Sequence, residues 1–377
     1  MSKVSSIAKI IGEMNWPVIN DKDTQMVEID DKSYVNFTSN DYLGLSVDEQ
    51  LKQGMINSIQ TYGCGSTGSR RLSGNHQLFL DVEGLVSSWV GQPSGVFFNS
   101  GFQMNVAIFQ TLATQSTLIL ADKLSHASLV DGIINSTAPW KRFRHNDMDH
   151  LNQLLSKYHT QYDQIFVVVE SIYSMDGDQA DLYGLVQLKL KYGFKLIVDE
   201  AHAIGVYGDQ GRGLVSHQNL VSSVDIILLT FGKAFGLSGA ALLSDEKTTA
   251  EIKLRCRSYI YSTALPLPNI AAIKTALNLV ISANIQREQL YQNIDLFKSL
   301  VSTKSLTQIQ PVIIGEKDKA NQLEQYLMEH GIFSRAVHHP TVPYGESRLR
   351  ITVLSHHTST QIVECATKIN AWLTNEQ

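Results

Sequence analysis

The 377-residue chain has few cysteines, no long apolar run and no block of like charge. Its three cysteines, Cys64, Cys256 and Cys365, form no CxxC pair and show no metal-ligand spacing, so we expect no disulfide, no metal site and a reducing cytoplasm. No stretch approaches the ~18 apolar residues that a membrane span needs, and no signal-peptide pattern is present. With a net charge of −5 and dispersed Lys and Arg, we expect binding to neither nucleic acid nor a membrane.

Several catalytic motifs are also missing. The chain contains no GxSxG elbow, Walker A loop or HExxH helix, so hydrolase, nucleotide-triphosphatase and zinc-protease functions lack support. One G-x-G-x-x-G pattern runs from Gly63 to Gly68, but a dinucleotide fingerprint must follow a strand and open a helix. A polar, helix-like stretch precedes this pattern, which therefore favours a loop over a Rossmann site.

Short apolar runs alternate with helical stretches through the middle of the chain. Continuous apolar runs of this length are typical of strands buried on both faces, which predicts an α/β fold with a mostly parallel central sheet flanked by helices. The runs are residues 95–99, 116–122, 164–170, 194–200, 224–230 and 239–244.

The pattern changes after residue 246. A long amphipathic helical stretch covers about 268–300, followed by two strand-like runs and a helix that indicate a smaller C-terminal α/β unit. We expect an N-terminal segment (1–45), a large domain (46–280) and a small domain (281–377). Within the first segment, apolar residues from Val4 to Met14 fit one face of a short helix.

Polar side chains follow five of the apolar runs at the point where each run ends. Ligands of open parallel sheets bind beyond the carboxyl ends of the strands, so we expect these side chains to meet at one rim. The five sets are Asn99 to Phe102, Asp122 to His126, Glu170 to Asp176, Asp199 to His202 and Thr230 to Lys233.

These residue types suit one kind of cofactor. Lys233, between glycines, can form a Schiff base with an aldehyde, and Asp199 can keep a ring nitrogen protonated. A histidine can lie against a flat ring. The residues from Asn99 to Phe102 precede a helix that we expect to begin near Asn105, and free amides at a helix start bind phosphate. Together they predict a pyridoxal-phosphate site.

The sequence resembles the α-oxoamine synthase family of fold-type I pyridoxal-phosphate transferases along nearly its whole length. TFGKAFG with VDEAH is the most specific part of the resemblance. The segments that carry it are SNDYLGL (39–45), YGCGSTGSRRLSG (62–74), FNSGFQMN (98–105), ADKLSHASLVDG (121–132), RFRHND (142–147), SMDGD (174–178), VDEAHAIGVYGDQGRG (198–213), TFGKAFGLSGA (230–240), YSTALPLP (261–268), IQPVIIG (309–315) and PTVPYGESRLRITV (340–353).

The resemblance implies a role for each matching residue. Lys233 would be the cofactor lysine and the base that removes the amino acid α-proton, Asp199 would pair with the ring nitrogen, and His126 would stack on the ring. His202 and Ser174 would contact the cofactor's oxygen side. The remaining implied contacts are Gly101, Phe102 and Thr230 with the phosphate, Thr263 from a partner subunit, Asn40 and Arg350 with the amino acid carboxylate, and Thr341 in the substrate site.

The implied reaction joins an amino acid to an acyl thioester with loss of carbon dioxide, in a homodimer with its active site at the interface. GSTGSRRLSGN and HHPTVPYGESRLRI resemble members that use L-alanine and pimeloyl-CoA, or a pimeloyl carrier protein, in biotin biosynthesis. Other members, namely glycine C-acetyltransferase, 5-aminolevulinate synthase and autoinducer synthase, stay open as alternatives. So do an aminotransferase on the same fold and a catalytically silent, protein-binding paralogue.

One departure from the family concerns the acyl substrate. Members often carry an arginine near the N-terminus that meets the acyl chain, whereas residues 1–40 contain no arginine here. The sequence therefore leaves open how the far carboxyl group of a pimeloyl chain would be held.

Overall fold

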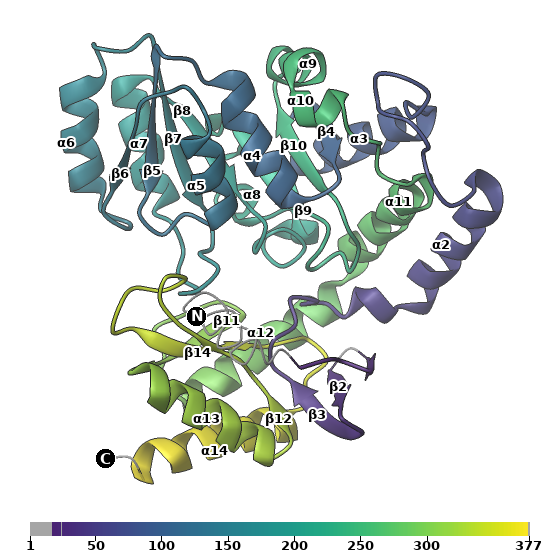
Figure 1. Cartoon of the computed structure of the whole chain (residues 1–377), viewed down its shortest axis with the longest axis vertical. Helices are drawn as coiled ribbons and strands as arrows, with labels where there is room; N and C mark the ends of the chain where they lie inside the picture. Colours follow the sequence, from purple (N-terminus) through teal and green to yellow (C-terminus); the bar gives the residue numbers. More distant parts are fainter. Residues whose placement is uncertain (1–16, 24, 376–377) are drawn as a thin grey trace, which may run out of the picture.

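The computed structural model describes residues 17–23 and 25–375 (Figure 1). An upper body surrounds a seven-stranded sheet, and a smaller lower body contains two further sheets. The helical face expected over residues 4–14 lies outside the described residues. In the described part of the chain, no helix is long and apolar enough to cross a membrane.

The seven-stranded sheet has the order β4-β10-β9-β8-β7-β5-β6. Strand β10 runs antiparallel to both of its neighbours, and the other neighbouring strands are parallel. This arrangement confirms the predicted fold class. The strands are β4 (Ser94–Phe98), β5 (Thr117–Asp122), β6 (Trp140–Phe143), β7 (Gln164–Glu170), β8 (Lys195–Asp199), β9 (Ile226–Thr230) and β10 (Ala240–Ser244).

Alternate side chains of the central strands enter two different cores. In β5, Leu118 and Leu120 join one apolar cluster, whereas Ile119 and Ala121 join the other. Successive strand side chains point to opposite faces, so a strand covered on both sides must be apolar throughout. Strand β6 was not anticipated, because WKRF lies at the sheet edge, where polar side chains face solvent.

Helices cover both faces of this sheet. One face packs against α4 (Gly101–Leu112), α5 (Ala127–Ile134), α9 (Glu246–Arg255) and α10 (Arg257–Ile260). The opposite core includes side chains of α3 (Gln77–Val90), α6 (Met148–Tyr158), α7 (Leu182–Tyr192), α8 (Leu214–His217) and α11 (Leu267–Ser282). The upper body also contains α2 (Glu49–Tyr62), η1 (Leu45–Val47), η2 (Asp209–Gly211) and η3 (Val221–Ser223).

The lower body combines both ends of the chain. Strand β12 (Ile332–Phe333) pairs in parallel with β3 (Lys32–Asn36), which brings the N-terminal strands beside the C-terminal unit. The other strands are β1 (Asp21–Lys22), β2 (Met26–Ile29), β11 (Ile309–Gly315), β13 (Ala336–Val337) and β14 (Ser347–Thr352). The helices are α12 (Asn284–Leu300), α13 (Lys317–Glu329) and α14 (Ser359–Asn375).

The long helical stretch expected near 268–300 is two helices, α11 and α12. The chain leaves helical geometry at Ala283, where φ is −76° and ψ is 38°. Nη1 of Arg287 donates to the carbonyl oxygen of Val280 at 2.6 Å, and Nη2 donates to Oδ1 of Asn284. The Val280 carbonyl, which also accepts from the N–H of Ala283, thus gains a side-chain donor, so hydrogen bonds stabilise the break although no proline marks it.

Candidate active site

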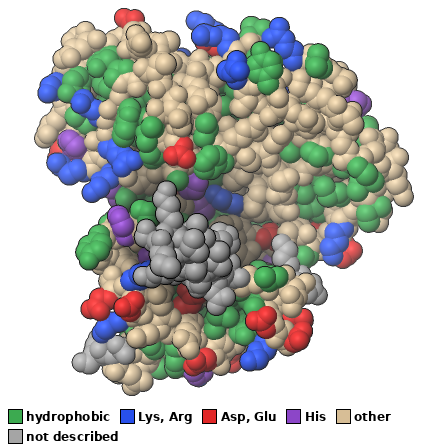
Figure 2. Space-filling view, in the orientation of Figure 1, with side chains coloured by type: hydrophobic (Ala, Val, Ile, Leu, Met, Phe, Trp, Pro, Cys, Tyr) green, Lys and Arg blue, Asp and Glu red, His purple; other side chains and the backbone are tan. Residues whose placement is uncertain are grey.

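The carboxyl ends of β7, β8 and β9 and the start of α4 surround one cavity of about 200 Å³. In Figure 2 the surface is hollowed between the two bodies, and Lys, Arg and His side chains gather at the hollow. The cavity is lined by Gly101, Phe102, Met104, Asn105, His126, Ser128, Glu170, Asp199, Ala201, His202, Leu229, Thr230 and Lys233. Lys233 and Asp199, the two residues on which the cofactor prediction depends most, thus share a single cavity.

Lys233 lies in the turn after β9, and its amine meets a histidine. Nζ of Lys233 is 2.8 Å from Nε2 of His202. Burial lowers the pKa of Lys233 to about 8, although the nearby carboxyl groups of Asp199 and Glu170 oppose the change. A substantial fraction of this amine is therefore neutral near pH 8, and a neutral amine can attack an aldehyde or accept a proton.

His202 belongs to a path of hydrogen bonds that leads away from the cavity. Burial, followed by the charges of Lys233 and Arg350, lowers the pKa of His202 well below its ordinary value. A neutral ring that accepts from the Lys233 ammonium at Nε2 carries its hydrogen on Nδ1, which is 2.6 Å from the Tyr42 hydroxyl. That hydroxyl donates to Oδ1 of Asn40 at 3.1 Å. These hydrogen bonds connect the Lys233 amine to Asn40.

Asp199, at the end of β8, has a fixed orientation. Its Oδ2 accepts from Nδ2 of Asn105 at 3.0 Å, and its Oδ1 accepts from the backbone N–H of Ala201 at 2.9 Å. Nδ2 of Asn105 also lies 3.0 Å from Oγ of Ser128, which in turn is 2.7 Å from Nδ1 of His126. One buried amide therefore aligns both the carboxylate and the histidine expected to contact the ring.

Glu170 is a third acid at this rim, at the end of β7. Burial, together with the charge of Asp199, raises the pKa of Glu170 to about 8. Its Oε1 accepts from the backbone N–H of His126 at 2.6 Å. A carboxyl group that is mostly neutral at pH 7 can hold the His126 loop without adding a second full negative charge beside Asp199.

The start of α4 forms the end of the cavity suited to a phosphate. We expected this helix to begin near Asn105, but it begins at Gly101, with Ser100 as the N-cap. Oγ of Ser100 accepts from the N–H of Gln103, and the first amides of a helix have no partner within it. A methyl group added to Gly101 would lie 3.8 Å from Oγ1 of Thr230, so the helix start and this hydroxyl are adjacent. Both are suited to binding an anion.

A second polar group lies where the two bodies meet. Nη2 of Arg350 donates to Oδ1 of Asn40 at 3.1 Å, and Nε donates to the carbonyl oxygen of Ser174 at 2.6 Å. The structure thus brings Asn40, Ser174 and Arg350 together, although they come from three distant parts of the chain. Ser174 does not line the cavity and contributes its backbone oxygen to this group.

Two further predicted residues lie apart from both the cavity and the group around Arg350. Thr263 lines a separate small cavity, where its carbonyl oxygen accepts from Nδ2 of Asn99 at 2.9 Å. Thr341 is exposed, in a loop where its N–H donates to the carbonyl oxygen of His338. Within this single chain neither side chain is brought to Lys233.

Sequence reasoning missed Asn105 and Tyr42 as site residues. Asn105 is a polar residue among apolar neighbours on α4, and such a position is a detectable sign of a buried partner. Tyr42 is wholly buried and follows Asn40 by two positions, but no pattern indicates that its hydroxyl reaches His202.

A model of the class I and II aminotransferases matches residues 32–369. The chain belongs to this family. Within it the chain is an α-oxoamine synthase, which confirms the resemblance found in the sequence. A Bacillus cereus (strain G9842) protein provisionally named 8-amino-7-oxononanoate synthase is 42% identical over 337 residues, which cover 87% of this chain and 85% of the relative. A Bacillus mycoides protein of the same provisional name is 41% identical over 336 residues, with the same two coverages.

Solved structures of this family have the same fold. Serine palmitoyltransferase from S. paucimobilis superposes with a TM-score of 0.93 at 27% identity, covering 100% of this chain and 99% of that one. The 8-amino-7-oxononanoate synthase from Francisella tularensis gives a TM-score of 0.79 at 30% identity, covering 91% and 98%.

Family membership confirms the chain as a pyridoxal-phosphate enzyme. The residues present fit this cofactor, because a single cavity holds an amine with a lowered pKa, an oriented carboxylate and a helix start beside a hydroxyl.

Proposed function

We propose that the chain catalyses the condensation of L-alanine with a pimeloyl thioester, either pimeloyl-CoA or a pimeloyl carrier protein. The products would be 8-amino-7-oxononanoate, carbon dioxide and the free thiol, as a step in biotin biosynthesis. The observation that carries this proposal is a path of hydrogen bonds. It runs from Nζ of Lys233 through His202, Tyr42 and Asn40 to the guanidinium of Arg350. The path has an amine of lowered pKa at one end and a guanidinium at the other, which supports binding of an α-amino acid between them.

Pyridoxal phosphate, when bound, supplies an aldehyde that joins to amines and a ring that draws electrons from the amino acid's α-carbon. In our proposal Asp199 holds a proton on the ring nitrogen, and Asn105 keeps that carboxylate in place. His126 stacks on the ring and His202 supports its oxygen side, whereas Ser174, outside the cavity, holds Arg350 through its backbone oxygen. Gly101, Phe102 and Thr230 hold the phosphate.

The amino acid is oriented by the second polar group. Arg350 and Asn40 bind its carboxylate, and Thr341 belongs to the substrate site. Lys233, whose pKa of about 8 leaves part of its amine neutral, removes the α-proton and later returns a proton.

A panel of substrates tests the proposal. The cofactor-loaded protein is mixed with alanine, glycine or serine and with acetyl-CoA, succinyl-CoA or pimeloyl-CoA, and free thiol and carbon dioxide are measured. We expect release only with alanine and pimeloyl-CoA, and a pimeloyl carrier protein is tested in parallel. Turnover with glycine and acetyl-CoA instead would replace this proposal by a related synthase, and amino transfer without thiol release would indicate an aminotransferase.

We also propose that the protein acts as a homodimer with the active site at the interface. Large apolar side chains are exposed on α2, α3 and the loop between them, which favours burial against a second copy. They include Ile56, Ile59, Leu72, Leu80 and Leu85. A dimer would allow Thr263 of one copy to approach the phosphate in the other, and light scattering of the purified protein measures its mass directly.

The domain division belongs to the same proposal, with an N-terminal segment (1–45), a large cofactor domain (46–280) and a small domain (281–377). A cytoplasmic location accords with the free thiols of Cys64, Cys256 and Cys365.

A further inference from the structure

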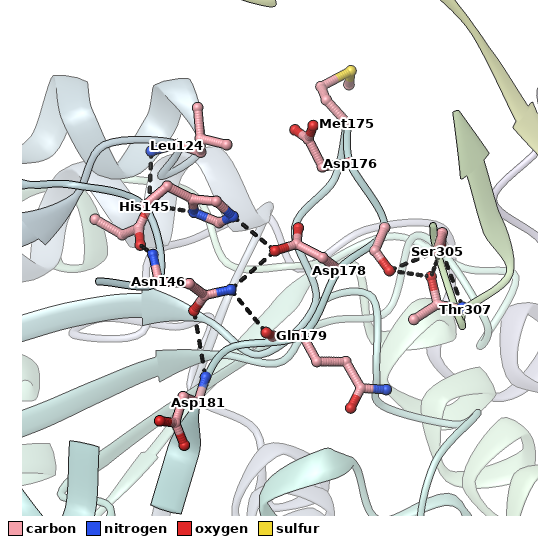
Figure 3. A network of polar contacts seen from close by, with 12 residues as sticks. Leu124, His145, Asn146, Met175, Asp176, Asp178, Gln179, Asp181, Ser305 and Thr307 are labelled. Atoms are coloured by element: carbon pink, nitrogen blue, oxygen red, sulfur yellow. Dashed lines mark hydrogen bonds and ion pairs between the residues drawn. The ribbon is translucent and has the colours of Figure 1, made fainter. Parts of the chain in front are cut away.

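A partly buried ion network of His145, Asp122 and Asp178 lies beside the active site, and none of the three has a role in the proposed reaction (Figure 3). His145 follows β6 and bridges two aspartates. Its Nδ1 is 2.9 Å from Oδ1 of Asp122, and its Nε2 is 2.7 Å from Oδ2 of Asp178. The Asp122 side chain is fully buried, whereas 24% of the His145 side chain and 37% of the Asp178 side chain are exposed.

The geometry gives His145 a positive charge. An ionised carboxylate can only accept hydrogen bonds, so both ring nitrogens of His145 must donate. Burial by itself lowers the pKa of this ring, but the hydrogen bonds and charges of Asp122 and Asp178 outweigh it and raise the pKa to about 10. The bridge is therefore charge-assisted at both ends across the neutral range.

Asp178 ends a short loop of the large body, residues 174–178, that contacts the small body. On the lower side, the carbonyl oxygen of Gly177 accepts from Oγ of Ser305 at 2.9 Å and from Oγ1 of Thr307 at 2.8 Å. Gly177 has φ of +66°, and a Cβ there would lie 2.2 Å from the carbonyl oxygen of Ile309. The segment is thus held on one side by Ser305 and Thr307 of the small body and on the other by His145 and Asn146, whose Nδ2 donates to Oδ2 of Asp178 at 2.9 Å (Figure 3).

The same segment also contacts the carboxylate-binding group. The carbonyl oxygen of Ser174 accepts from Nε of Arg350 at 2.6 Å, and the side chain of Asp176 pairs with Arg348. A displacement of residues 174–178 is therefore expected to change the direction of the Arg350 guanidinium. Besides His145, Asp122 accepts from two backbone N–H groups, those of Leu124 and Asn146, whereas the Asp178 side chain has one further donor, Nδ2 of Asn146 at 2.9 Å. Asp178 therefore relies more on His145 than Asp122 does.

We infer that His145 is a positioning residue for the amino acid substrate, which acts through Asp178 and residues 174–178 on the direction of Arg350. The inference rests on the proposed function only in that Arg350 binds the amino acid carboxylate. It assigns a role to the RFRHND segment, which family resemblance marks but the proposed reaction does not use.

Two substitutions at His145 separate this role from a purely structural one. In His145→Asn the new side-chain amide nitrogen would occupy the place of Nδ1 and reach only Asp122, whereas His145→Gln would extend an amide toward Asp178. Amino acid affinity is measured on the cofactor-loaded protein, without any thioester, from the change in cofactor absorbance as alanine is added. We expect His145→Asn to weaken the apparent affinity about tenfold or more, because misplacement far from the chemistry is costly. His145→Gln should recover most of this loss.

The control is His159→Asn, at an exposed histidine beyond α6, which should leave the affinity unchanged. Cofactor absorbance before alanine is added should be the same in all the variants. Should the His145→Asn variant fail to fold, Asp178→Asn removes the charge with little change of shape and should weaken affinity in the same direction. Equal affinities in wild type and His145→Asn would overturn the inference, as would equal losses in His145→Asn and His145→Gln.

A parallel titration with glycine and serine keeps the two proposals apart. If the wild-type protein responds to glycine and not to alanine, the proposed substrate is wrong, and the His145 series is read with glycine. If it responds to alanine but the variants do not differ, the proposed substrate stands and the inference about His145 fails.

Discussion

The proposed cofactor side and the proposed amino acid side of the site are built differently. Lys233, Asp199 and Glu170 end neighbouring strands of one sheet or follow them directly, so a single rigid element sets their spacing. Arg350 and Asn40, by contrast, are 310 positions apart and meet only where the small body lies against the large one. The cofactor side is therefore fixed by the fold of one body, and the amino acid side depends on how two bodies are held together.

This difference predicts two kinds of variant. Changes on the sheet rim should reduce the chemical step or cofactor attachment and leave amino acid affinity less affected. Changes at the junction should mainly weaken the affinity for the amino acid.

The largest effect should come from Lys233→Ala. The variant loses both the amine that attaches the cofactor and the base that moves the α-proton, so turnover should fall by about a thousandfold or more. The visible absorbance that the cofactor acquires on joining a lysine should disappear. Lys253→Ala, at a partly exposed lysine on α9, is the matched control, and turnover within tenfold of wild type in the Lys233 variant would refute its role.

Asp199→Asn should have the next largest effect. The amide keeps the size of the side chain but cannot hold a proton on a ring nitrogen, so turnover should fall by about a hundredfold or more while the fold is kept. The far-ultraviolet circular dichroism spectrum should match that of wild type, and thiol release gives the rate. Normal turnover in this variant would defeat the assignment of the ring-nitrogen partner.

Arg350→Gln tests the amino acid side. Loss of the guanidinium charge should weaken alanine affinity by about tenfold to a hundredfold, with a smaller effect on turnover at saturating alanine. The KM for alanine and kcat are measured separately, with Arg257→Gln, at an exposed arginine, as the control. A fall in kcat with KM unchanged would show that Arg350 acts in the chemical step and not in amino acid binding.

The smallest predicted effect is a pH dependence of cofactor uptake by the apoprotein. Only the neutral amine of Lys233 attacks an aldehyde, and burial lowers its pKa to about 8 from an ordinary value of 10.5. The rate of uptake should thus rise with pH and level off above about pH 8. Stopped-flow absorbance measures it, and a rate that keeps rising to pH 10 would show an unperturbed lysine.

Much of the cofactor side could be predicted from the sequence. The runs that became β5, β7, β8 and β9 are apolar throughout, and parallel strands align their carboxyl ends at one rim. The polar residues that follow them were therefore predicted to meet. The start of α4 was misplaced by four residues, because Ser100 caps the helix from within a stretch rich in small residues.

The amino acid side could be predicted only through family resemblance. No local pattern in SRLRIT indicates that Arg350 reaches Asn40, nor that His145 joins Asp122 to Asp178. These contacts depend on loop conformations and on how the two bodies pack, and neither leaves a periodic signal in the chain.

The sequence by itself determined the parallel sheet, the polar rim at its strand ends and the lysine that marks the cofactor, because burial on both faces requires continuous apolar runs. Only the tertiary structure decided that α4 begins at Gly101 beside Thr230, that Asn105 orients Asp199, and that residues 174–178 connect His145 to Arg350. The physical reason is sequence separation. Strand periodicity comes from neighbouring residues, whereas these hydrogen bonds join groups that approach one another only after the whole chain has packed.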